Sequence, residues 1–177
     1  TADDILTLLV HLGYLTYDFD TKTAWIPNKE VRQEFLNSIQ GGGNEKVAVS
    51  NINTIINNDI QKVWNIVLAV DKYNLWRSDL SKTEIINDKQ FIEYTKNGYA
   101  TTFTVTVVEP YKRWEFDMEN SNMKGHWIGI FTDKGNETQI DFTENVIPKK
   151  WFMKPFVKTY LKKQQKQFVL DLKKALE

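Results

Sequence analysis

The sequence lacks cysteine altogether, has only two histidines among its 177 residues and contains no long apolar run. The missing cysteines exclude a disulfide scaffold, a thiolate zinc site and a cysteine nucleophile. The histidines, His11 and His126, lie far apart in the chain, so a histidine-based metal site is not expected. No stretch reaches the roughly 18 apolar residues of a transmembrane helix, and no signal-type segment opens the chain. We therefore expect a cytoplasmic protein with no integral membrane segment, no metal and no cofactor.

The charges balance overall but are unevenly distributed along the chain. Residues 149–177 hold nine lysines against Asp171 and Glu177, whereas residues 1–148 hold 14 basic and 21 acidic residues. A basic C-terminal segment could contact nucleic acid or an anionic membrane. We favour a solvated helix face whose lysine stems cover apolar surface, because no platform of basic and stacking aromatic residues accompanies it. Nucleic acid is therefore not expected as a partner.

A run of three glycines divides the chain into residues 1–40 and 45–177, with a flexible linker at 41–44. Before the linker, apolar residues at helical spacing predict one helix, and alternating residues around a turn at 20–22 predict a hairpin. A second helical pattern follows. We expect residues 1–40 to form a small helix-hairpin-helix, winged-helix-like appendage that is too small to be stable alone.

The stretch LTLLVHLGYLTYDFDTKTAWIPNKEVRQEF at 6–35 resembles the end of the ATPase-like domain in bacterial AAA-ATPase-like proteins with a PD-(D/E)XK nuclease-like domain. Its LGYL and IPNKEV elements carry the resemblance, which covers only about residues 3–40. The chain has no GxxxxGK[ST] phosphate loop and no nuclease carboxylate set, so no ATPase or nuclease residue is transferred. The resemblance suggests a chimera, natural or engineered, whose first 40 residues have no activity of their own.

The rest of the chain reads as a strand, two short helices, six more strands and a long helix. Asn58 is expected to cap the first helix, and Asn97-Gly98 is a strong hairpin signal. Strands that follow one another through tight turns predict an antiparallel sheet in an α+β domain, with only the last helix long enough to cover one face. A ligand would sit between the sheet and that helix. The predicted strands are 46–56, 82–87, 89–96, 99–108, 112–119, 123–132 and 137–147, and the last helix is 150–176.

Residues 45–177 resemble the SRPBCC superfamily of START lipid-transfer domains, polyketide cyclase/dehydrase-like proteins and Bet v 1-type allergens. The resemblance rests on IQKVWNIVLAVDKYNLW (60–76), EPYKRWEFDMEN (109–120), GHWIGIFTDKG (125–135) and TQIDFTENV (138–146). It implies a helix-grip (Bet v 1-like) fold, in which a curved antiparallel seven-stranded sheet wraps around a long C-terminal helix. Members include carriers, cyclases, hydrolases and co-chaperones, so the fold leaves the function open.

Aromatic residues at alternating strand positions and on two helices are predicted to line a large apolar pocket. The alternative is that the same side chains simply fill the core. Gly125 and Gly129 alternate with large residues, which indicates either sheet curvature or room for a ligand. The predicted lining aromatics are Trp76, Phe103, Trp114, Trp127, Phe131, Phe142, Phe156 and Tyr160.

Three polar residues are candidates for chemistry in this pocket. Glu144 shares the strand phase of its apolar neighbours, so it is expected to point inward, where burial would raise its pKa. The alternative is a solvent-exposed or lysine-paired residue at the end of the strand. Gln164 lies on the apolar side of the last helix and is expected either to offer a polar contact to a ligand or simply to lie at the edge of the helix. His126 has the phase opposite to Trp127 and is expected to face outward; facing inward, it would be a general base.

The sequence favours binding over catalysis, because no nucleophile–base pattern emerges. We expect a non-catalytic binder or carrier of a hydrophobic small molecule that is lipid, aromatic or polyketide-like. One alternative is a polyketide cyclase/dehydrase-like enzyme in which Glu144 or His126 moves a proton. The other is a co-chaperone-like module with a protein partner, which predicts a filled core and an exposed apolar patch.

Overall fold

The computed structural model describes residues 15–26, 29, 32, 47–150 and 153–177. Its first element is a short antiparallel hairpin of β1 (Thr16–Asp18) and β2 (Thr23–Trp25). The Asp18 carboxylate accepts the backbone N–H groups of Asp20 and Thr21, which fixes the turn. The predicted hairpin is thus confirmed, whereas the helices expected on either side of it and the 41–44 linker lie outside the described residues.

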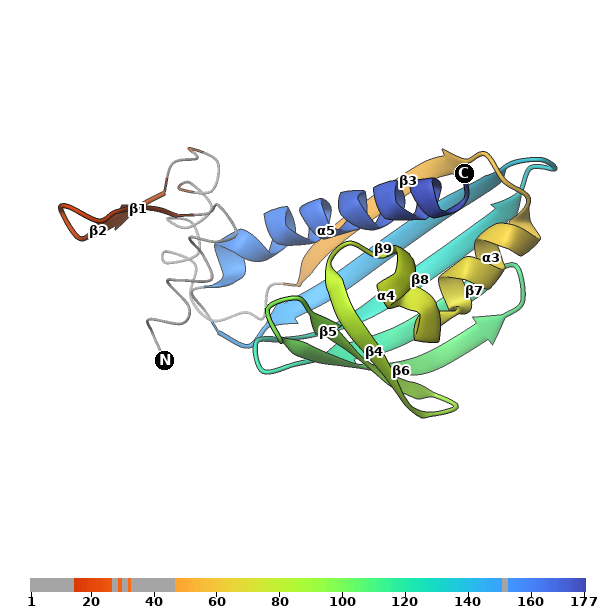
Figure 1. The fold of residues 1–177 in the computed structure, drawn as a ribbon, viewed down its shortest axis with the longest axis horizontal. Helices are drawn as coiled ribbons and strands as arrows, with labels where there is room; N and C mark the ends of the chain where they lie inside the picture. Colours follow the sequence, from red (N-terminus) through yellow and green to blue (C-terminus); the bar gives the residue numbers. More distant parts are fainter. Residues whose placement is uncertain (1–14, 27–28, 30–31, 33–46, 151–152) are drawn as a thin grey trace.

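Seven strands form one antiparallel sheet in the order β3-β9-β8-β7-β6-β5-β4 (Figure 1). From β4 to β9 each strand pairs with the next one along the chain, and β3 joins the far side of β9. The predicted meander is therefore confirmed. The strands are β3 (Ala48–Ile56), β4 (Leu80–Asn87), β5 (Gln90–Thr95), β6 (Ala100–Glu109), β7 (Arg113–Glu119), β8 (Met123–Asp133) and β9 (Thr138–Pro148).

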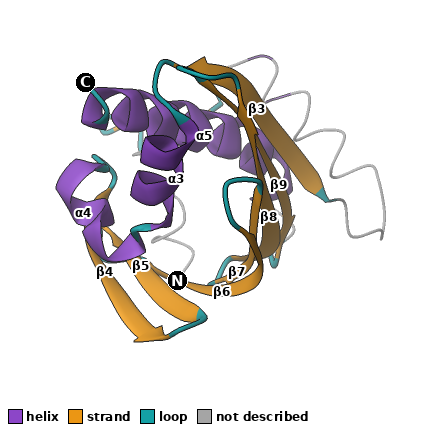
Figure 2. Cartoon of the chain, turned by 90° about the vertical axis from the view of Figure 1, so that its right-hand side faces the viewer, coloured by secondary structure: helices purple, strands orange, loops and turns teal. Residues whose placement is uncertain are grey.

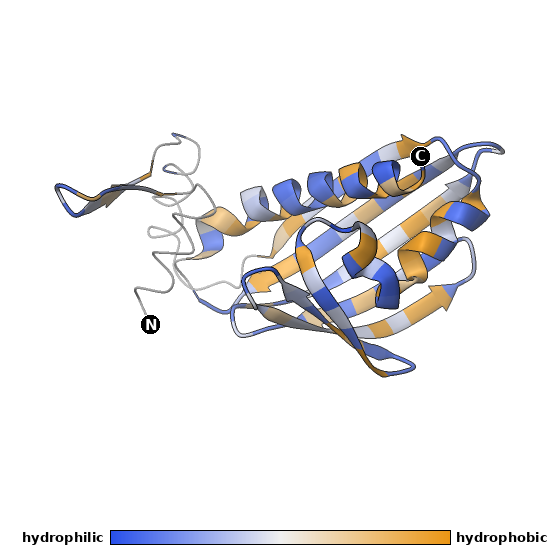
Figure 3. Cartoon of the chain, in the orientation of Figure 1, coloured by the Kyte–Doolittle hydropathy of each residue, from blue (hydrophilic) through white to orange (hydrophobic). Residues whose placement is uncertain are grey.

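Hydrophobic and polar residues alternate along the central strands, which gives the sheet one apolar and one polar face (Figure 3). The β8–β9 ladder runs without a register shift from the Met123–Pro148 pair to the Asp133–Thr138 pair. Register shifts interrupt the β6–β7 and β4–β5 ladders. Because a bulge bends its strand and increases the twist, these irregularities help to curl the sheet.

Two helical segments connect β3 to β4: α3 (Ile60–Leu68), followed by a 3-10 turn (Val70–Lys72) and α4 (Tyr73–Trp76). The expected cap at Asn58 is wrong by one residue. The Asp59 carboxylate accepts the backbone N–H of Lys62 at 3.0 Å and caps α3. The Asn58 amide instead donates to the backbone carbonyl of Leu176 at 3.3 Å, so it ties this loop to the end of the chain.

The long helix α5 (Lys154–Ala175) lies along the concave side of the sheet (Figures 1 and 2). Its buried apolar residues are Phe156, Val157, Leu161, Val169 and Leu172. Among them the Gln165 side chain is also buried; it accepts a hydrogen bond from the Ser50 hydroxyl at 2.7 Å and so joins α5 to β3. No helix among the described residues is long and apolar enough to cross a membrane.

Candidate functional site

A row of large aromatic side chains covers the concave face of the sheet. Phe91 on β5 pairs with Phe103 on β6, and their rings stack with centroids 4.8 Å apart. Phe116 on β7 pairs with Trp127 on β8, and these rings also stack at 4.8 Å. Since directly paired residues point to the same side of a sheet, the aromatic pairs build one apolar wall.

Between this wall and α5 lies a chamber of about 130 Å³, and next to it a vestibule of about 750 Å³. The chamber is close in size to a cavity that holds one benzene molecule, roughly 150 Å³. The vestibule lies between the β5–β6 turn, the β7–β8 turn and the first half of α5. The two spaces share six lining residues: Asp79, Thr95, Thr101, Met123, Tyr160 and Gln164.

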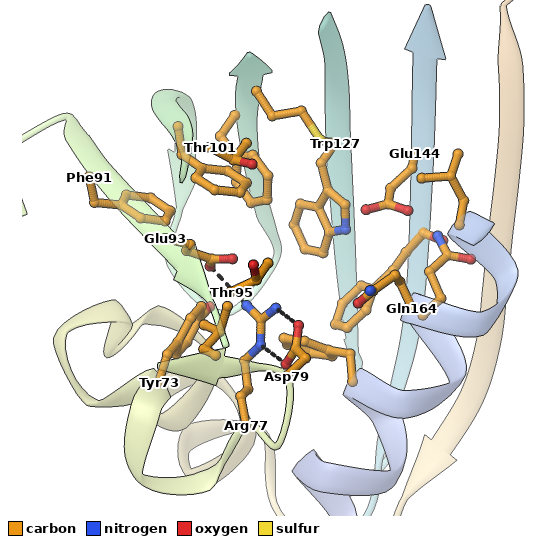
Figure 4. A pocket seen from close by; sticks show the side chains of 18 of the residues that line it. Tyr73, Arg77, Asp79, Phe91, Glu93, Thr95, Thr101, Trp127, Glu144 and Gln164 are labelled. Carbon is orange, nitrogen blue, oxygen red and sulfur yellow. Dashed lines mark hydrogen bonds and ion pairs between the residues drawn. The ribbon is translucent and has the colours of Figure 1, made fainter. Parts of the chain in front are cut away.

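Glu144 is paired with Trp127 across the β8–β9 ladder, and both side chains line the chamber (Figure 4). Its Oε2 atom is buried and has no hydrogen-bond partner among the described residues. Burial raises the pKa of Glu144 from an ordinary 4.5 to about 7, an effect that Arg77 opposes and Glu93 strengthens. Near neutral pH the carboxyl group can therefore donate or accept a hydrogen bond.

Arg77 lies at the opposite side of the chamber, just after α4 (Figure 4). Its guanidinium binds Asp79 through Nε–Oδ1 at 3.2 Å and Nη2–Oδ2 at 2.7 Å, and it binds Glu93 through Nη1–Oε1 at 2.8 Å. The guanidinium carbon also lies 5.1 Å from the ring centroid of Tyr73 and 5.3 Å from that of Phe168. Burial raises the pKa of Glu93, although Arg77 opposes the change. One cation and two carboxyl groups thus form a compact ion cluster in the chamber wall.

The helix α5 contributes a second polar pair at the junction of chamber and vestibule. The Gln164 amide donates to the Tyr160 hydroxyl at 3.2 Å. Burial raises the pKa of Tyr160, so the phenol remains neutral and can still donate its proton. The junction therefore offers hydrogen-bonding groups without a net charge from α5.

The structure brings most of the predicted site residues together. Trp76 is half-buried and packs edge-on against Tyr73 and Phe168, whereas Phe131 is buried and packs against Trp64 and Phe142. Neither of these two residues lines the chamber. Phe156 is buried and borders the vestibule. Those that line the chamber are Phe103, Trp114, Trp127, Phe142, Glu144, Tyr160 and Gln164.

His126 faces away from the chamber, as its strand phase predicts. Its Nδ1 lies 2.7 Å from Asp117 Oδ1 and its Nε2 lies 3.1 Å from Glu115 Oε2, on the outer face of the sheet. Glu115 is itself paired with Arg113. A general base at His126 acting on a molecule in the chamber is therefore ruled out by the direction of this side chain.

The glycines on β8 leave room for protein side chains. A Cβ atom at Gly129 would overlap the outer ring atoms of Trp127, and one at Gly125 would crowd the backbone carbonyl of Asn145 and the side chain of Val146. The Trp127 indole thus occupies the space beside Gly129 where a side chain would otherwise be. The sequence indicates either sheet curvature or room for a ligand at these glycines. At Gly129 the room is taken by the Trp127 indole and not by a ligand.

Sequence reasoning missed the ion cluster of Arg77, Asp79 and Glu93. Glu93 lies two residues after Phe91 on β5 and so shares its face of the sheet, which means that strand phase alone could have indicated that Glu93 points inward. Arg77 and Asp79 follow α4 in a segment without periodicity, and no pattern signals their direction. Within the described ranges, no three histidine, aspartate or glutamate side chains converge to hold a metal ion.

Comparison with solved structures identifies the fold. A START superfamily protein from Mycobacterium smegmatis superposes with a TM-score of 0.67 at 12% identity, over 72% of this chain and 95% of that protein. The Zhui aromatase/cyclase from a Streptomyces species superposes with a TM-score of 0.65 at 9% identity, over 73% of this chain and 93% of that protein. A conserved protein from Geobacillus kaustophilus superposes with a TM-score of 0.63 at 13% identity, over 72% of this chain and 93% of that protein. At these identities the similarity establishes the helix-grip fold.

Sequence comparison identifies the family. No curated protein matches the chain. The family model described as polyketide cyclase/dehydrase and lipid transport matches residues 46–177, about three quarters of the sequence. The same residues form the sheet and the long helix that the START-type neighbours share. The chain therefore belongs to the polyketide cyclase/dehydrase and lipid transport family of the SRPBCC superfamily.

Proposed function

We propose that this protein binds and carries a hydrophobic small molecule, without transforming it, in the chamber and vestibule between the sheet and α5. The observation that carries this proposal is the aromatic chamber lined by Glu144, whose Oε2 atom has no hydrogen-bond partner in the described part of the chain. Apolar surface buried there contributes roughly 25 cal/mol per Å² to binding, and Glu144 or Gln164 can orient one polar end. The chamber counts against the partner-binding alternative, which requires a filled core.

Native mass spectrometry of the purified protein, compared with its denatured mass, tests the proposal. We expect a bound species of a few hundred daltons, or a mass shift when a panel of neutral, anionic and cationic hydrophobic compounds is added. A protein that purifies without a bound species and takes up no member of the panel would contradict it.

A pair of neighbouring threonines on β6 provides a matched control. Thr101 borders both the chamber and the vestibule, whereas Thr102 borders a hollow on the outer face of the sheet. Thr101→Trp places an indole at the junction and should reduce binding. Thr102→Trp adds the same side chain outside and should leave binding unchanged. Equal loss in the two variants would show that the molecule does not enter at this junction.

A cyclase- or dehydrase-type enzyme is the second candidate, and the ionisation of Glu144 favours it. A carboxyl group with a pKa of about 7 inside a chamber is suited to moving a proton on a bound carbonyl compound. Under this alternative, Glu144→Gln abolishes conversion of a co-purified compound while the compound still binds. Under simple carriage, the compound is recovered unchanged from both proteins.

A further inference from the structure

The charged groups that line the chamber are unequal in sign. Among the residues that the structure describes, three carboxyl groups, those of Asp79, Glu93 and Glu144, lie in the chamber lining with the single guanidinium of Arg77. When all four are ionised, these groups give the chamber a formal charge of −2. Lys96 belongs to the vestibule, at the β5–β6 turn, and does not line the chamber. The chamber is therefore an acidic as well as an aromatic environment.

The positive charge of Arg77 is already balanced by two acids. Its three guanidinium nitrogens all bond to Asp79 or Glu93, in a bidentate arrangement on the Asp79 side. A ligand carboxylate would compete with these acids for the guanidinium and would lie in the same small space as Glu144. Uncompensated like charges at such a site are strongly unfavourable. The chamber consequently disfavours fatty acids and other organic anions.

Unlike Arg77, Glu144 has an atom free to accept a hydrogen bond, because its buried Oε2 has no partner among the described residues. Trp127 lies directly across the ladder, and an indole face attracts a cation more strongly than any other side-chain ring. Resting on the proposed function, we infer that the bound molecule is a hydrophobic organic amine. Its ammonium donates to Glu144 beside Trp127, and its apolar part lies among the aromatic rings of the chamber and the vestibule.

The titratable groups that line the chamber together with Glu144 support this assignment. They are Tyr73 from α4, Arg77 and Asp79 from the segment after α4, Glu93 from β5 and Tyr160 from α5. Two of them are acids, and the only cation is already paired with those two. An ammonium would stabilise the ionised form of Glu144 and reverse the effect of burial on its pKa. Amine binding should therefore strengthen from about pH 6 to pH 8, unlike binding of a neutral compound.

Isothermal titration calorimetry with three compounds on one ring system tests the inference: 2-naphthylmethylamine, 2-naphthylmethanol and 2-naphthoate. We expect the amine to bind about tenfold or more tightly than the alcohol at pH 8, and the carboxylate to bind weakest. Glu144→Gln should remove the advantage of the amine and leave alcohol binding within about twofold. Glu137→Gln, which removes the same charge from an exposed position in the β8–β9 turn, serves as the control and should keep the preference.

The outcomes separate this inference from the proposed function. Alcohol or carboxylate binding as tight as amine binding would overturn the amine assignment while leaving a hydrophobic carrier. An amine preference that survives Glu144→Gln would also overturn it, because the cation would then be recognised elsewhere. Failure of all three compounds, together with the absence of any co-purified species, would overturn both.

Discussion

Arg77, just after α4, and Glu93, on β5, form a buried ion pair with 2.8 Å between Nη1 and Oε1. The pair joins the helical connection to the sheet, and Asp79 bonds the other side of the same guanidinium at 2.7 Å. Because the cluster sits in the chamber wall, it both supports the fold at this edge and sets the charge of the site. Removing the cation would leave two acids without their partner.

Arg77→Met should destabilise the protein by about 3 to 5 kcal/mol, as expected when one partner of a buried ion pair is lost. Urea unfolding followed by circular dichroism measures the change. Lys82→Met provides the matched control, since Lys82 pairs with Glu84 on the exposed surface of β4. The prediction fails if both variants unfold at the urea concentration of the wild-type protein.

The protonation of Glu144 should make stability depend on pH. Its pKa is about 7 in the folded protein and near the ordinary 4.5 when unfolded, so the folded state holds the proton more tightly. The contribution of Glu144 to the free energy of unfolding therefore falls as pH rises from about 4.5 to 7, by about 3 kcal/mol in total. Glu144→Gln lacks this loss and should be the more stable protein at pH 8.

The comparison of the two proteins at pH 5 and pH 8 isolates Glu144 from Glu93. Burial also raises the pKa of Glu93, but this group is present in both proteins and cancels in the difference. A stability difference between wild type and Glu144→Gln that stays constant with pH would show that Glu144 is ionised and solvated in the folded state.

Strand phase predicted the direction of several site residues because the ladder that carries them is regular. Trp127 and Glu144 lie in β8 and β9, which pair without interruption, so counting by twos from an apolar residue gives the correct face. The same counting places His126 outside. Turn signals also predict that the last six strands pair consecutively, because these strands follow one another through short turns. The residue pattern does not predict the pairing of β3 with β9.

Other features of the site depend on packing that periodicity does not express. Trp76 and Phe131 have apolar neighbours whether they line the chamber or fill the core, and only the positions of Phe168 and Trp64 decide between the two. Arg77 follows a helix of four residues, too short to define a face. Its direction is set by the acids it meets, one of them 16 residues away on β5.

The hydrogen bonds of Gln165 should fasten α5 to the sheet. Its side chain accepts from the Ser50 hydroxyl at 2.7 Å and donates to the Ser50 backbone carbonyl at 3.2 Å, in a buried position. Gln165→Leu leaves these groups unsatisfied and should cost about 1 to 3 kcal/mol of unfolding free energy. Gln164→Leu, at the preceding residue, removes only the hydrogen bond to the Tyr160 hydroxyl and should cost less.

The double variant Ser50→Ala/Gln165→Leu tests the cause of that loss. When both side-chain partners are removed, the buried hydroxyl no longer lacks a bond, so part of the stability should return. Urea unfolding of the four proteins gives the coupling energy. Additive losses would mean that Gln165 stabilises the helix by packing alone.

The Trp127 indole lies against Gly129, two residues along the same strand, and this contact should make the glycine irreplaceable. The indole is buried between Phe116 and Phe142, with ring centroids 4.8 Å away on each side, so it has little freedom to move when a Cβ is added. Gly129→Ala should therefore destabilise the protein by about 1 to 3 kcal/mol through overpacking.

A second substitution identifies the atoms responsible. The Cβ atom added at residue 129 would overlap Cη2 and Cζ3 of Trp127. A phenylalanine at residue 127 has a smaller ring that lacks these outer atoms. Trp127→Phe alone leaves a cavity and is destabilising. In the double variant Trp127→Phe/Gly129→Ala the methyl group occupies part of that space, so the double variant should be more stable than the sum of the single losses predicts. Strictly additive losses would mean that the indole does not lie against Gly129. The chamber wall would then have a different shape from the one described.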